Sequence, residues 1–173
     1  MNNAFEWKSF HSEILFSMLN PLHQLSSPDL LKDFLRFAGI EGTFENLELS
    51  INENQSILLI QDKKQGILIE NNLDEYSDCD KELLRFIDEC ISEYFIKILL
   101  IVSIHWKEKD EIRHLPREVN SMIHNLTANE VASFFDDWCN KQKEKSLAKV
   151  ILINYSKKLR EEPNGETKKS VNE

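Results

Sequence analysis

The chain has 173 residues, of which 41% are hydrophobic and 29% are charged, and its formal net charge is −9. This length and balance fit one globular domain and exclude a wholly disordered chain. No apolar run reaches the roughly 18 residues that a membrane-spanning helix needs, and the net negative charge argues against tight, non-specific binding to nucleic-acid phosphates.

The first residues and the cysteines indicate a cytoplasmic protein. The start, Met1 to Glu6, has no basic region and no small-residue cleavage site, so we expect no signal peptide. The three cysteines are an odd number without a C-x-x-C pair, which argues against a disulfide framework and a structural zinc site. We therefore expect Cys79, Cys90 and Cys139 to be ordinary reduced residues that pack like small hydrophobes.

Two helices are predicted before residue 40. Apolar side chains at helical spacing predict a helix over about residues 3–20, and Pro21 ends the pattern. The second helix is expected to begin after Ser27, a good cap residue, with Pro28 at its first position. Gly39 fits just past its end, where a helix often stops.

The hydrophobic period then changes to two, which is typical of strands. The three predicted strands lie at residues 47–51, 56–60 and 67–70. A turn over residues 62–66 joins the last two as a hairpin. A helix over about 78–94 follows, and then a fourth strand over 96–106, whose nearly uninterrupted apolar run is typical of a central strand.

The C-terminal part is predicted to be helical after an irregular charged stretch. Thr127 to Glu130 form a capping box, which opens a helix. The lysine-rich piece from Lys141 continues it, or forms a second short helix. Residues 161–173 are polar and expected to be disordered, which leaves one domain over residues 1–160. The predicted order is α-α-β-β-β-α-β-α, with helices covering a mixed sheet.

Charge is unevenly distributed along the chain. Residues 41–96 contain fourteen acids and four bases, whereas residues 141–160 contain seven bases and one acid. The basic stretch is either a local contact for an anionic partner or a solvated helix face. The acidic middle favours a basic protein surface over nucleic acid as a partner.

Three segments between residues 10 and 86 carry a family resemblance. Residues 10–21, FHSEILFSMLNP, contain a His-Ser pair followed by an apolar run that closes in Asn-Pro. Residues 56–60, SILLI, are followed by a turn and by GILIENNL at 66–73. Asp78 precedes ELLRF at residues 82–86. In this order and spacing the segments resemble the opening helix, the catalytic Ile-Glu-Asn-Lys hairpin and the following helix of one branch of the PD-(D/E)XK nuclease superfamily.

The resemblance implies a fold, an activity and a cofactor. The implied fold is a restriction-endonuclease-like core, α-β-β-β-α-β, with a mixed central sheet flanked by helices. The implied activity is hydrolysis of DNA or RNA phosphodiesters with Mg²⁺, which carboxylates hold and which lowers the pKa of the attacking water. The His-Ser pair at His11 and Ser12 is expected to fix the first helix against the sheet.

The family's catalytic positions are only partly retained. Glu70 stands at the glutamate position, either as a residual metal ligand or as a strand-end carboxylate that points to solvent. The lysine position, two residues on and so on the same strand face, is Asn72. The aspartate position falls on Ile57, or on Ser56 if the register shifts by one, and isoleucine cannot hold a metal.

Other residues could complete a site. Glu13 or Glu6 are candidates for the acid of the first helix, Glu82 replaces a glutamine of the family, and Asp78 could join Glu70 as a metal ligand. A rearranged site could also draw a ligand from Asp62 or Asp74 and a positive charge from Lys81 or Arg85.

Two functions are compatible with these residues. The first is a catalytically impaired or inactive relative that acts as a binding or regulatory module beside a protein partner, as the lost aspartate and lysine positions favour. The alternative is an active metal-dependent nuclease with a rearranged site, which the retained Glu70 favours. The aromatic residues at helical spacing are expected to be core rather than base-stacking residues: Phe34, Phe37, Phe134, Phe135 and Trp138.

Overall fold

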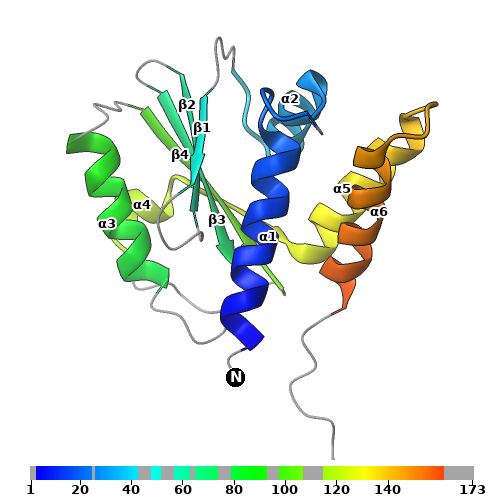
Figure 1. The fold of residues 1–173 in the computed structure, drawn as a ribbon. Coiled ribbons are helices and arrows are strands. Elements are labelled where there is room, and N and C mark those ends of the chain that lie inside the picture. Colours follow the sequence, from blue (N-terminus) through cyan, green and yellow to red (C-terminus); the bar gives the residue numbers. More distant parts are fainter. Residues whose placement is uncertain are drawn as a thin grey trace, which may run out of the picture.

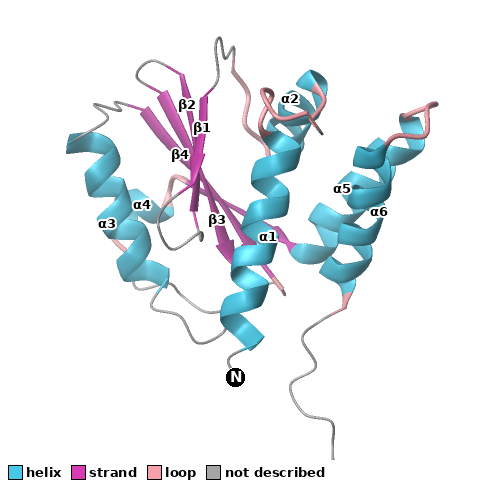
Figure 2. Ribbon diagram, viewed as in Figure 1, coloured by secondary structure: helices cyan, strands magenta, loops and turns pink. Residues whose placement is uncertain are grey.

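The described part of the chain forms a five-stranded sheet with helices on both faces (Figure 1 and Figure 2). The computed structural model describes residues 3–24, 26–42, 48–51, 57–62, 65–73, 79–92, 98–106 and 115–161. In chain order the elements are α1 (Asn3–Leu19), α2 (Pro28–Phe37), β1 (Glu48–Ile51), β2 (Ile57–Asp62), β3 (Gln65–Asn72), α3 (Cys79–Ser92), β4 (Ile98–His105), α4 (Arg117–Asn120), β5 (Ile123–Thr127), α5 (Ala128–Lys141) and α6 (Leu147–Arg160). The predicted mixed sheet flanked by helices is confirmed.

The sheet is mixed because its two halves are connected differently. Its strand order is β1-β2-β3-β4-β5. The first three strands are an antiparallel meander, as predicted, whereas β3, β4 and β5 run parallel to one another. The chain passes through α3 between β3 and β4, as a parallel pair requires. The carboxyl ends of β3 and β4 therefore lie side by side.

The two faces of the sheet are covered by different helices (Figure 1). Because side chains alternate along a strand, neighbouring residues of β2, β3 and β4 enter different cores. Leu58, Ile69 and Val102 belong to a large core with residues of α1, α2, α5 and α6. Ile57, Leu68 and Ile101 instead pack with residues of α3. Burial on both faces explains why these strands are almost continuously apolar.

The residues that begin and end α2 lie largely where they were predicted. Pro28 is in its first turn, and Gly39 follows its end with φ +77°, a left-handed conformation that suits glycine. Ser27 stands at the N-cap position with an extended backbone, but its side chain makes no capping hydrogen bond to the described residues. The predicted capping role of Ser27 is therefore wrong, although the helix begins where predicted.

Two elements of the C-terminal half were not predicted. The stretch expected to be irregular contains α4, of four residues, and the strand β5, which pairs with β4 in parallel. β4 is thus an interior strand, while β3 holds the middle position. The capping box at Thr127 is present, and the lysine-rich piece forms a separate helix, α6, which begins after Ser146.

A few predicted features lie outside the described residues. Residues 162–173, within the tail predicted to be disordered, lie outside the described residues, as do residues 93–97 at the predicted start of the fourth strand. Cys90 and Cys139 are buried free thiols, as predicted, whereas nothing is described of the Cys79 side chain. Within the described ranges, none of the helices combines the length and apolar character that a bilayer crossing demands.

Candidate functional site

Glu70 and Asn72, two positions that the family resemblance marks, lie at the carboxyl end of β3, beside that of β4. Glu70 pairs with Ser103 across these parallel strands, and Asn72 pairs with His105. In open α/β sheets, ligands bind preferentially at the carboxyl ends of parallel strands. Glu70 alternates with Leu68, which packs with α3, so its side chain belongs to the face that α3 covers.

The carboxylate of Glu70 is buried and hydrogen-bonded. Only 2% of Glu70 is exposed, and the fully buried Ser103 donates a hydrogen bond from Oγ to Glu70 Oε2 at 2.5 Å. Hydrogen bonds to a carboxylate are stronger than those between neutral groups, and a buried carboxylate is costly without them. The alternative that Glu70 points to solvent is therefore wrong.

Ser103 is on β4, and on β2, the other neighbour of β3, an apolar side chain is paired with Glu70. The antiparallel register of β2 and β3 pairs Ile57 directly with Glu70, and Ile57 is fully buried in the core beneath α3. Ser56, the neighbouring candidate, lies outside the described residues. Ile57 offers no ligand atom to an ion beside Glu70.

In the described part of the chain, no other acidic candidate joins Glu70 in a metal-binding group of three or more side chains. Glu13 is exposed on α1, whose buried residues pack on the opposite face of the sheet. Glu82 is half-buried in the first turn of α3, on the same face as Glu70. Asp62 is at the hairpin end of β2, away from the carboxyl end of β3. Asp78 and Asp74 lie outside the described residues, as do the side chains of Asn72 and Glu6.

The described residues gather no set of three or more metal-ligating side chains around Glu70. Mg²⁺ prefers oxygen ligands in near-octahedral geometry and is usually held by one or two carboxylates together with water and substrate phosphates. Among the described ranges, no cluster of three or more histidine, cysteine, aspartate or glutamate side chains is placed to hold a metal ion. Glu70 accepts a hydrogen bond from Ser103 on one side and pairs with Ile57 on the other.

The His-Ser pair fixes α1 on the opposite face of the sheet, as predicted. Asn71, the residue after Glu70, donates a hydrogen bond from Nδ2 to Ser12 Oγ at 3.3 Å. His11 is fully buried, with its ring centroid 5.7 Å from that of Trp106 and 5.4 Å from that of Tyr155. Burial lowers the pKa of His11 to about 4, so the imidazole is neutral at pH 7.

β4 and β5 contribute polar partners that were not predicted from the sequence. Ser103 binds Glu70, and the ring of His105 contacts Asn125 through Nε2 and Oδ1 at 3.2 Å. A signal for Ser103 was present, since a serine interrupts the otherwise apolar run of residues 98–104. A polar side chain in a strand buried on both faces needs a hydrogen-bond partner, and Glu70 is that partner.

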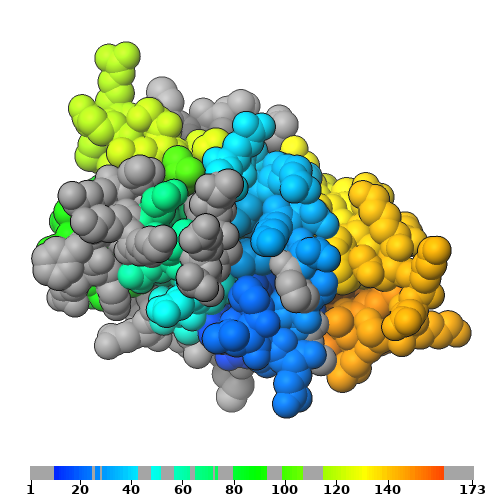
Figure 3. All heavy atoms as spheres, turned by 90° about the horizontal axis from the view of Figure 1, so that it is seen from above, coloured from blue at the N-terminus to red at the C-terminus, as the bar shows by residue number. Residues whose placement is uncertain are grey.

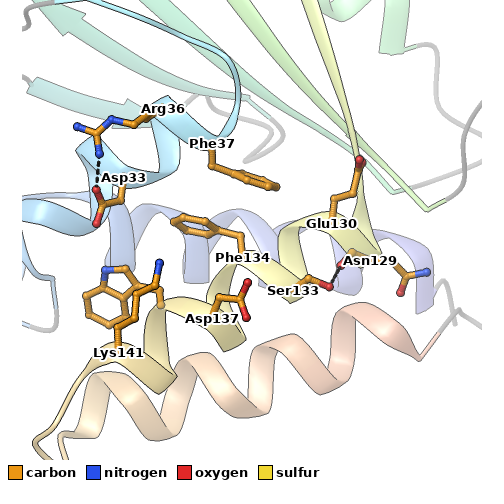
Figure 4. Close-up of a pocket in the computed structure, with 10 residues that line it drawn as sticks. Asp33, Arg36, Phe37, Asn129, Glu130, Ser133, Phe134, Asp137 and Lys141 are labelled. Atoms are coloured by element: carbon orange, nitrogen blue, oxygen red, sulfur yellow. Dashed lines mark hydrogen bonds and ion pairs between the residues drawn. The ribbon is translucent and has the colours of Figure 1, made fainter.

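A second feature of the molecule is a groove between α2 and α5, remote from Glu70. Its volume is about 590 Å³, and residues of both helices line it (Figure 4). The two helices lie side by side in the view from above, α2 in light blue and α5 in yellow (Figure 3). Phe34 and Phe135 are buried as predicted, but Phe37, also predicted to be core, is 38% exposed at this groove.

Comparisons with protein-family models, with curated proteins and with solved structures found no match to this chain. The resemblance to the PD-(D/E)XK nucleases therefore rests on the three segments between residues 10 and 86 of the sequence.

Proposed function

We propose that the protein is a catalytically inactive relative of the PD-(D/E)XK nucleases that acts as a binding or regulatory module. The observation that carries the proposal is the surroundings of Glu70, whose buried carboxylate accepts a hydrogen bond from Ser103 and is paired across the sheet with Ile57. The family relation is supported by the order α1-β1-β2-β3-α3-β4, with α2 inserted after α1, and by the antiparallel hairpin that delivers Glu70.

The lost side chains are those on which the family's chemistry depends. A carboxylate opposite Glu70 would share the metal, and a lysine at position 72 would stabilise the negative charge that develops on the phosphate. Removing a single electrostatic donor of this kind costs about 10²–10³ in rate in well-studied enzymes. Ile57 supplies no metal ligand and Asn72 supplies no positive charge, so the proposal assigns no hydrolytic step to this chain.

Glu70 retains a structural role in this proposal. Its hydrogen bond with Ser103 joins β3 to β4 in addition to the backbone ladder, beneath α3. On the opposite face, Asn71 and Ser12 join β3 to α1. The Glu70–Ser103 contact thus lies at the place where an active relative would keep an open metal site. The net charge of −9 favours a protein over nucleic acid as the partner.

A cleavage assay tests this proposal. The full chain is incubated with plasmid DNA and with RNA in the presence of Mg²⁺ or Mn²⁺, beside the variants Glu70→Gln and Glu118→Gln. Glu118 is exposed on α4 and serves as a matched control. We expect the three proteins to show no difference in metal-dependent cleavage. Cleavage by the wild type and by Glu118→Gln that is lost in Glu70→Gln would refute the proposal and indicate a working, rearranged nuclease site.

A further inference from the structure

The solvent side of α6 carries exposed apolar side chains. Leu147 and Val150, one helical turn apart, are 64% and 54% exposed, and the half-buried Ile151 lies beside them. The helix contributes a different set of residues, on its other side, to the large core: Leu152, Tyr155 and Leu159. α6 packs beside α5 at the edge of the molecule (Figure 1 and Figure 3). The helix therefore has a second apolar surface in addition to the one that it buries.

Lysines stand at both ends of this apolar surface. Lys143 and Lys145 precede α6 and are exposed. Lys157 is exposed in the last turn, two helical turns after Val150 and so on the same side of the helix. Within the described ranges, none of these three lysines has an ion pair. Together with Leu147 and Val150 they form what we call the outer face of α6.

Residues 141–161 are basic even after their ion pairs are set aside. The segment contains seven bases and two acids. One of the bases pairs with Glu161 at 3.1 Å, and another pairs with Asp136 of α5 at 2.7 Å. Five lysines then remain, and Glu144 is the acid that remains with them.

The other acids of the neighbouring helix α5 are placed elsewhere. Glu130 accepts from Thr127 in the capping box, and Asp137 lines the groove between α5 and α2. Charges more than about 8 Å away are largely screened at physiological salt. The net charge of −9 on the whole chain therefore does not cancel the positive charge at the outer face of α6.

We propose that the outer face of α6 binds an acidic amphipathic helix of a partner protein. Apolar side chains of the partner pack on Leu147 and Val150, and its carboxylates reach the lysines at the two ends. The outer face is the convex side of a helix, and a second helix fits such a surface by placing its side-chain ridges between those of the first. The 14 residues of α6 span about 21 Å, so a partner helix of about four turns reaches both ends. The inference rests on the proposed role as a binding module and names the chemical class of the partner.

Other occupants fit this surface less well. In a second copy of the chain, two outer faces would place lysines opposite lysines in either direction. A helix that lies in a membrane interface needs an apolar face along its length, whereas the exposed Asn154 and Lys157 occupy the second half of this face. Leu147 and Val150 cannot stack on bases as aromatic side chains do, so they add nothing to nucleic-acid binding.

The test selects twenty-residue peptides from a display library on the immobilised full chain. Each peptide has leucine at positions with helical spacing and random residues elsewhere. We expect the selected peptides to contain more aspartate and glutamate than the unselected library. The strongest one is labelled with fluorescein and titrated by fluorescence anisotropy, where its Kd should rise with salt. A version with lysine at every acidic position should not bind.

Single substitutions then locate the binding surface. Val150→Asn should weaken binding of the selected peptide about tenfold, because it removes an apolar contact area. Its control is Ile91→Asn on α3, where the side chain is 55% exposed, and this change should leave the Kd unaltered. Lys145→Glu should weaken binding about fivefold, the upper range for an exposed ion pair. Lys32→Glu makes the same charge change at an exposed position on α2 and should have no effect.

Two competitors test the other occupants: vesicles of phosphatidylcholine with phosphatidylserine, and a twenty-nucleotide single strand. Three results would overturn the inference. The first is selection that enriches no acidic peptides, and the second is a Kd that is indifferent to both Val150→Asn and Lys145→Glu. The third is displacement of the labelled peptide by vesicles or by the strand at a concentration below the Kd of the peptide.

The cleavage assay reports on Glu70 and not on α6. Failure of the peptide experiment with no cleavage would refute the role of the outer face alone, whereas cleavage that depends on Glu70 would refute the proposed function.

Discussion

Burial of His11 should make the stability of the protein depend on pH in a predictable way. His11 lies in the core among the rings of Trp106 and Tyr155, and this burial lowers its pKa from 6.5 to about 4. In the unfolded chain the imidazole is solvated and takes up a proton below pH 6.5. In the folded protein it stays neutral until about pH 4, because the charged form is penalised by desolvation.

The sign and the size follow from the two pKa values. The folded pKa is the lower one, so the stabilising contribution is fully present above pH 6.5 and is lost as the pH falls toward 4. Each pH unit in this window lowers the free energy of unfolding by about 1.4 kcal/mol. Between pH 7.5 and pH 5.0 the loss from His11 is about 2 kcal/mol.

Urea unfolding at these two pH values measures the loss. The wild type is compared with His11→Phe, which keeps an aromatic ring but cannot be protonated, so the contributions of all other groups cancel. We expect the wild type to lose about 2 kcal/mol more than the variant on going from pH 7.5 to 5.0. His23→Gln, which removes a histidine from the loop after α1, serves as the control. Equal pH dependence of the wild type and His11→Phe would refute the assigned burial.

Three further substitutions test the fold around the site by urea unfolding at pH 7.5. Gly39→Ala, at φ +77°, should lower the free energy of unfolding by about 1 kcal/mol, and an unchanged value would contradict the left-handed conformation. Thr127→Ala removes the capping box of α5 and should cost about 1 kcal/mol, whereas Thr127→Ser should cost less. Ser103→Ala removes the donor to the buried Glu70 and should cost about 1–3 kcal/mol; no loss would argue against that hydrogen bond.

The parts of the fold that the sequence predicts well are those set by local patterns. Pro28 and Gly39 bracket α2 because their backbone preferences act within a few residues. The antiparallel meander follows from alternating apolar residues and a short turn. β5 escaped prediction because its residues, IHNLT, lack strict alternation and form a strand only through parallel pairing with β4. Such pairing depends on a distant segment, which local patterns do not report.

The same distinction applies to the candidate site. The position of Glu70 on a strand was predictable, but its burial was not, since its partner Ser103 is 33 residues away and reaches it through the parallel β3–β4 pair. Helical spacing marked Phe37 as core, yet its ring is partly exposed at the groove. Periodicity identifies the apolar side of a helix, whereas exposure at its edge depends on how the neighbouring helix packs.

The central claim is that Glu70 is a structural residue rather than part of a metal site, and Mn²⁺ binding tests it most directly. The wild type and Glu70→Gln are titrated with Mn²⁺, and the free ion is followed by its electron paramagnetic resonance signal. We expect the wild type to have no Mn²⁺ site that is tighter than about 1 mM and depends on Glu70. Stoichiometric binding of Mn²⁺ by the wild type, lost in Glu70→Gln, would contradict it.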